Sequence, residues 1–140
     1  MSNEQKPKIV EIIHSSPTGS MLIDHFLNND YLCFAITDQK GNFVYFNVGA
    51  EKLTGYDAKD IIGKNLSIFF KDPQEAAHVI GELKDSGYRV DPHVILMDQK
   101  SEELFISASL FRINDEKGEI AGIFIISFES PKMRMKQESL

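Results

Sequence analysis

Residues 36–65 read ITDQKGNFVYFNVGAEKLTGYDAKDIIGKN, and this stretch combines the signals of a hairpin with those of two short helices. The runs 31–37 and 43–46 are rich in aromatic and β-favouring residues. Between them lies a polar segment that contains Gly41, which suits a tight turn. The pattern therefore predicts two antiparallel strands at the start of a sheet.

The second half of the stretch predicts helices. Asn47 can accept a hydrogen bond from a backbone N–H and so cap a helix over residues 48–53, which Gly55 then ends. Asp57 is expected to begin a further turn in the same way, with Gly63 closing it. A hairpin followed by two short helices is the arrangement around which the rest of the chain is expected to fold.

Composition limits the kinds of protein that this chain can be. With 140 residues, 42% of them hydrophobic, it can form one domain with a proper core. The formal net charge of −6 makes nucleic acid and anionic membranes poor partners. The longest apolar run, residues 120–128, is too short to span a bilayer, and the polar start has no signal-peptide core, so we expect a cytoplasmic protein. The single cysteine, Cys33, agrees with a reducing compartment and is expected in the core.

Further helices are expected on both sides of this stretch. Apolar residues at helical spacing predict two helices within residues 1–30, before the sheet. After a single turn at residues 66–70, Asp72 and Pro73 suit the cap and first position of a helix that ends near Gly87.

Differences between the strand patterns predict their places in the sheet. Residues 32–36 and 120–128 are apolar at nearly every position, as interior strands covered on both faces are. Residues 104–113 alternate only in part. Residues 88–97 contain Pro92, which belongs on an edge strand.

The order of these pieces resembles the PAS domain family over roughly residues 31–130. This resemblance implies an α+β fold, with a five-stranded antiparallel sheet, helices on one face and N-terminal flanking helices. Its first and fifth strands are expected side by side in the middle, with the second and third at the edges. The residues that carry it are Asp38 and Gly41 in the first turn, Asn47, Leu53-Thr54-Gly55-Tyr56 and Ile62-Gly63-Lys64-Asn65.

PAS domains commonly hold a small molecule between the sheet and the helices. We expect such a pocket to be lined by Leu66, Phe69, Val79 and Leu83. The flavin photoreceptors of the family use a cysteine at the position of Leu66, so covalent flavin chemistry is not expected. Non-covalent flavin and a small metabolite remain candidate ligands.

The haem-binding members of the family suggest another cofactor. They bind iron through a histidine on the long helix before the third strand, where His78 lies. The sequence around His93 also resembles a stretch beside the haem of oxygen sensors. His78 is therefore a candidate metal ligand, with a salt bridge to Glu82 one helical turn away as the structural alternative.

No recognisable catalytic constellation is present, since the chain lacks a phosphate-binding glycine loop and a zinc-protease motif. We therefore expect a non-enzymatic sensory or dimerisation module that relays a signal to an output domain. The output would belong to a histidine kinase, a cyclic-dinucleotide enzyme or a transcription regulator. The alternative is an interaction module that binds no small ligand. In either case residues 131–140, with Met133 and Leu140 seven positions apart, are expected to begin a linker helix.

The last expectation concerns the face of the sheet that the helices of residues 48–86 leave uncovered. Interior strands that are apolar on both faces need cover on this side as well. The apolar residues of the N-terminal helices can supply it, either on their own sheet or on that of a second copy. We expect a homodimer through these helices, because the apolar cluster at residues 9–13 is broad for so short a helix.

Overall fold

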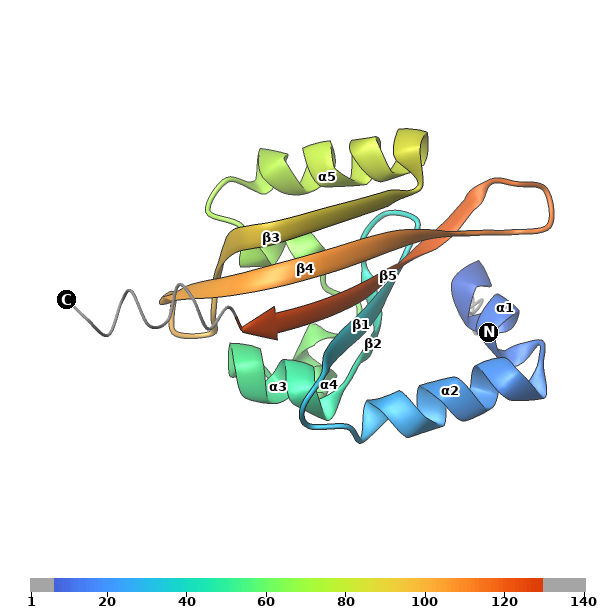
Figure 1. Ribbon diagram of the computed structural model, residues 1–140, viewed down its shortest axis with the longest axis horizontal. Helices are drawn as coiled ribbons and strands as arrows, with labels where there is room; N and C mark the ends of the chain where they lie inside the picture. The colour runs from blue at the N-terminus through green and yellow to red at the C-terminus, as the bar shows by residue number, and fades with distance from the viewer. Residues whose placement is uncertain (1–6, 130–140) are drawn as a thin grey trace, which may run out of the picture.

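The computed structural model describes residues 7–129. The expected linker helix at 131–140 lies outside these residues. This part of the chain begins with two helices, continues with a hairpin and four helical segments, and ends with three strands (Figure 1). The elements are α1 (Lys8–His14), α2 (Pro17–Leu27), β1 (Cys33–Asp38), β2 (Phe43–Phe46), α3 (Val48–Thr54), α4 (Ala58–Ile61), η1 (Leu66–Phe69, a 3-10 turn), α5 (Pro73–Ser86), β3 (Tyr88–Met97), β4 (Glu103–Asn114) and β5 (Ile120–Glu129).

The five strands form one antiparallel sheet in the order β2-β1-β5-β4-β3. The prediction that the first and fifth strands lie in the middle and the second and third at the edges is confirmed. In the β1–β5 pair Cys33 lies opposite Ser127, and Asp38 lies opposite Gly122. The register of β3 shifts between Asp91 and Val94, as expected for an edge strand that contains a proline.

Helices α3, α4 and α5, together with η1, pack against one face of the sheet, here called the inner face. Side-chain caps fix two of the helix starts as predicted, because Asn47 accepts from the Ala50 N–H and Asp72 from the Gln74 N–H. The cap expected at Asp57 is wrong. Glu51 Oε2 accepts from the Ala58 N–H at 2.7 Å instead, so the preceding helix supplies the acceptor.

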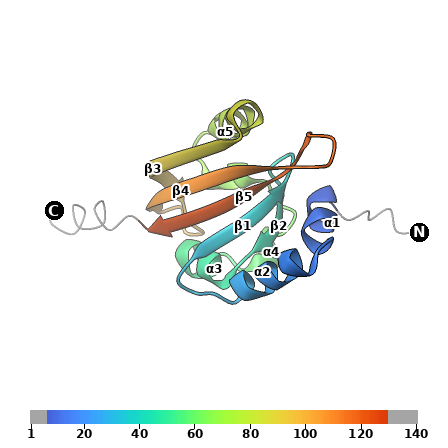
Figure 2. The same cartoon turned by 45° about the vertical axis from the view of Figure 1, so that its right-hand side comes forward.

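The other, outer face of the sheet is covered in part by the N-terminal helices. Ile9 of α1 and Ile23 of α2 are buried against Phe34 and Ile36 of β1. Figures 1 and 2 show both helices at the β1–β2 end of the sheet, with α5 along β3 at the other end. The prediction that these helices pack on the outer face is confirmed, and the sheet that they cover is their own.

The outer face of β3, and of the parts of β4 and β5 that lie beyond α1, has no helix packed on it within the described residues. Large side chains are exposed there, and we call this group the uncovered apolar patch. It consists of Tyr88, Val90, Phe111 and Phe128. Cross-strand pairing puts Tyr88 opposite Phe111, so the two lie on the same face of the sheet.

One buried amide joins the flank, the sheet and the helices. The Asn47 side chain accepts from the N–H groups of Phe34 and Ala50, each at 2.9 Å. Its Nδ2 group donates to the carbonyl oxygens of Phe26, Asn29 and Leu32 at 2.7–3.0 Å. Since these partners belong to α2, the following loop, β1 and α3, this side chain fixes how the N-terminal flank enters the sheet.

Candidate functional site

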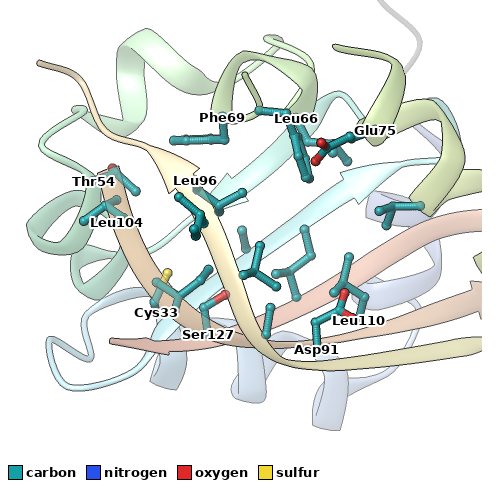
Figure 3. A pocket seen from close by; sticks show the side chains of 18 of the residues that line it. Cys33, Thr54, Leu66, Phe69, Glu75, Asp91, Leu96, Leu104, Leu110 and Ser127 are labelled. Carbon is teal, nitrogen blue, oxygen red and sulfur yellow. The ribbon is translucent and has the colours of Figure 1, made fainter. Parts of the chain in front are cut away.

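A cavity of about 650 Å³ lies between the inner face of the sheet and the helical layer. This volume is within the range of sites for small molecules, roughly 300–1,000 Å³. Figure 3 shows side chains from the sheet converging on it from below, with Leu66 and Phe69 of η1 on the opposite side. The cavity therefore opens between two layers that pack directly on each other elsewhere.

Aromatic rings form one wall of this cavity. Phe43 and Phe46 of β2 contact Phe69 of η1, with ring centroids 5.8 and 6.3 Å apart. Tyr56 packs edge-on against the same Phe69 ring at 5.6 Å. Because Phe69 is buried among three other rings, its orientation and this wall of the cavity are fixed by packing.

The floor of the cavity carries one polar pair. Cys33 of β1 and Ser127 of β5 lie opposite each other on paired strands, and both line the cavity. Both are labelled on the floor in Figure 3. Burial raises the pKa of the Cys33 thiol to about 12, with the Ser127 hydroxyl acting in the opposite direction. The thiol is therefore neutral and a poor nucleophile at physiological pH.

Charged side chains gather where the cavity meets solvent. Lys71, before α5, pairs with Glu103 of β4 at 3.6 Å. Arg89 of β3 bonds Asp91 on its own strand and Glu82 on α5. The hydrogen bond that Arg89 donates to the Asp91 carboxylate is the main reason that the pKa of Arg89 is raised. These contacts connect the edge of the sheet to the helical layer across the opening.

His78 lies at this entrance. Its side chain is 70% exposed, and its Nε2 atom is 2.8 Å from Glu82 Oε1. The nitrogen that would bind a haem iron is thus held by a carboxylate near solvent, and the residue does not fit an axial ligand in this arrangement. Among residues 7–129 there is also no cluster of three or more metal-ligating side chains.

Five of the six residues expected to bind a ligand line the cavity: Leu66, Phe69, His78, Val79 and His93. The expectation for Leu83 is corrected. It is fully buried in the core beside Leu110 and Ile123, one helical turn beyond Val79, where α5 and the sheet pack together.

Sequence reasoning missed Cys33 and Ser127 on the floor and the charged pair Arg89 and Asp91. For the charged pair a signal was present, because Arg89 and Asp91 are two positions apart on a strand and so share a face. For Ser127 the signal was weak, since it is one small residue in an otherwise apolar strand.

Comparison with known proteins agrees with this geometry. The sequence model described as PAS domain matches residues 31–129. The chain belongs to the PAS domain family. PAS domains are generally sensory modules, and no enzymatic family is indicated for this one. None of the curated proteins compared with the chain matches it.

Solved structures share this PAS fold at low sequence identity. A PAS domain from Colwellia psychrerythraea is 18% identical with a TM-score of 0.67, over 82% of this chain and 96% of that one. The dark structure of the blue-light photoreceptor Aureochrome1 LOV is 16% identical with a TM-score of 0.64, over 98% and 93%. An RNA-binding light-oxygen-voltage receptor is 14% identical with a TM-score of 0.70, over 99% of this chain and 41% of the receptor.

No helix within residues 7–129 has the length and apolar character needed to cross a membrane.

Proposed function

We propose that this PAS domain is a sensory input module that binds a small molecule in the cavity and relays its presence to an output domain. The observation that supports this best is the cavity itself, about 650 Å³ between the sheet and the helical layer. Empty volume in a core lowers the stability of the fold, so we would expect side chains to fill this space if the domain had no ligand to bind.

The arrangement of the entrance supports a route for the signal. Arg89 on the edge strand bonds Glu82 on α5, and Lys71 pairs with Glu103 of β4. A ligand that entered between these elements would change their separation. Because β4 is paired with β5 along its length, such a change would reach the strand from which the chain leaves the domain.

A thermal-shift screen tests ligand binding, since a molecule that binds only the folded state raises the melting temperature. We expect at least one small molecule to raise it for the wild type, and Phe69→Ala to reduce this response by reshaping the aromatic wall. Phe111→Ala, on the outer face, is the matched control and should keep the response. A broad screen without any shift would contradict the proposal.

The output and the setting of the domain follow from the sequence. We infer a cytoplasmic signalling protein such as a histidine kinase, a cyclic-dinucleotide enzyme or a transcription regulator. The domain itself is inferred to be non-catalytic and not to bind nucleic acid, because the formal charge of −6 opposes a phosphate backbone. Adding RNA to the protein in an electrophoretic mobility assay should leave its migration unchanged.

A second candidate function, a dimerisation module, is favoured by the uncovered apolar patch. The N-terminal helices bury Ile9 and Ile23 against their own sheet, while Val90 and Phe128 are more than half exposed. Apolar clusters of this kind commonly mark protein interfaces. We infer a homodimer that includes these helices and the patch beside them. Val90→Asp should shift the mass measured by light scattering from dimer to monomer, and a monomeric wild type would contradict the inference.

A further inference from the structure

The inner part of the cavity offers few polar groups. Within residues 7–129, its lining has two hydroxyl groups: Thr54 Oγ1, which donates to the Ala50 carbonyl at 2.8 Å, and that of Ser127, opposite the neutral Cys33 thiol. Among the described residues, every buried side-chain nitrogen or oxygen has a hydrogen-bond partner. No asparagine or glutamine side chain lines the cavity. The inner part of a ligand would therefore contact apolar atoms and few groups able to bond its polar atoms.

The charges at the entrance do not favour an anion. The lining includes two cations, Lys71 and Arg89, and three carboxylates, Glu75, Asp91 and Glu103, so its formal charge is −1 with histidines neutral. Both cations are already bonded to carboxylates. An anionic group would have to displace one of these partners. It would also be repelled by Glu75, which forms no salt bridge within residues 7–129.

We propose that the ligand of this cavity is a neutral, mainly apolar molecule. This inference rests on the proposed function and specifies its ligand class. On this proposal flavin nucleotides are not ligands of the cavity. The pyrimidine edge of a flavin carries several polar atoms, and the floor of the cavity offers too few hydrogen-bond partners for them. Each buried polar group without a partner lowers affinity by about five- to a hundredfold. The phosphate of a flavin nucleotide would also be repelled by the negative formal charge at the entrance.

Two fluorescent dyes with the same apolar skeleton test this proposal. Phenylnaphthylamine is neutral, and anilinonaphthalene sulfonate is the same molecule with one sulfonate added. The chain contains no tryptophan, so its own emission interferes little with either dye. We expect the full chain to bind the neutral dye at least about tenfold more tightly, because the sulfonate would have to lose its water without gaining a free cation.

Variants show which part of the dye signal comes from the cavity. Ala108→Phe fills the cavity from β4, and Val94→Phe fills it from the edge strand β3, where a larger side chain is accommodated more easily. Both should abolish binding of the neutral dye while circular dichroism shows a folded domain. Val90→Ser is the control on the outer face and should leave this binding unchanged.

The outcomes separate this inference from the proposed function. Cavity-dependent binding that favours the neutral dye supports both. If the sulfonate binds equally well at the cavity, or if flavin mononucleotide displaces the neutral dye, the ligand class is wrong and the sensory function stands. If neither dye binds in a way that depends on the cavity, while both filled variants are folded, the sensory function fails as well.

Discussion

Replacing Asn47 by alanine is expected to destabilise the domain severely. Asn47 is 1% exposed, and its side chain bonds donors and acceptors of four segments: α2, the loop after it, β1 and α3. Alanine would leave the N–H groups of Phe34 and Ala50 and the carbonyl of Leu32 without this partner. The Phe26 and Asn29 carbonyls accept other N–H groups and would be affected less.

The size of the effect follows from these groups. A buried group left unsatisfied costs about 1–3 kcal/mol, and loss of a helix cap about 1 kcal/mol. Allowing for water entry at the loop, we expect Asn47→Ala to lower the free energy of unfolding by about 3–5 kcal/mol. That is a large part of the roughly 5–15 kcal/mol of a typical domain, and it corresponds to a fall in melting temperature of about 10–20 °C.

Urea unfolding followed by far-ultraviolet circular dichroism measures this change. Asn65→Ala is the matched control, because Asn65 also caps a helical turn, through the Ser67 N–H at 3.0 Å, but is only half-buried. It should lower the free energy of unfolding by about 1 kcal/mol. If the two variants lose equal stability, or if Asn47→Ala loses less than about 1 kcal/mol, the bridging role of Asn47 is refuted.

Three other predictions concern backbone space, the buried thiol and the N-terminal flank. A Cβ atom at Gly49 would lie 2.2 Å from a backbone carbonyl oxygen, whereas one at Gly81 would have no atom within 4 Å. Gly49→Ala should therefore lower the melting temperature, and Gly81→Ala should raise the free energy of unfolding by about 0.5–1 kcal/mol. Similar effects of the two changes in a thermal melt would contradict this packing. With its pKa near 12, native Cys33 should react with iodoacetamide at pH 8 about a thousandfold more slowly than a free thiol, and mass spectrometry can follow the reaction. The Cys33 thiol ionises near pH 9 in the unfolded chain and near pH 12 in the native domain. The contribution of the neutral thiol to the free energy of unfolding is therefore complete below pH 9 and is lost as the pH rises to 12. Cys33→Ala should not show this loss. Deleting residues 1–28 should expose the outer face and cause aggregation, while deleting residues 1–16 should mainly weaken the dimer; a soluble 1–28 deletion with an unchanged melting temperature would show that the flank does not cover the sheet.

The sheet order was predicted from the resemblance to the PAS family, and the strand patterns agreed with it, because strands buried on both faces are more apolar than edge strands. The apolar run in β5 and Pro92 in β3 were enough to separate interior from edge strands. The caps at Asn47 and Asp72 were equally local and were confirmed. At Asp57 the local rule failed, since its side chain makes no cap bond and a glutamate one helix earlier accepts from the first N–H group of this turn.

The cavity could be predicted only in part. Helical spacing places Val79 and Leu83 on one face of α5, but the distance between helix and sheet decides which of them meets empty space. That distance depends on residues from several elements, among them Phe69 and Ile106, and no periodicity within one element records it. The bonding of Arg89 to both Asp91 and Glu82 is likewise a product of the fold.

Methyl-resolved NMR of the full chain titrated with phenylnaphthylamine tests the central claim most directly. Methyl groups inside the cavity, on Leu66, Val79 and Ile125, should shift and saturate with one dye per chain. Those of Val90, which does not line the cavity, should keep their positions, apart from small indirect changes. If the cavity methyls do not move, or if only those of the uncovered apolar patch respond, the cavity is not a ligand site and the sensory account is contradicted.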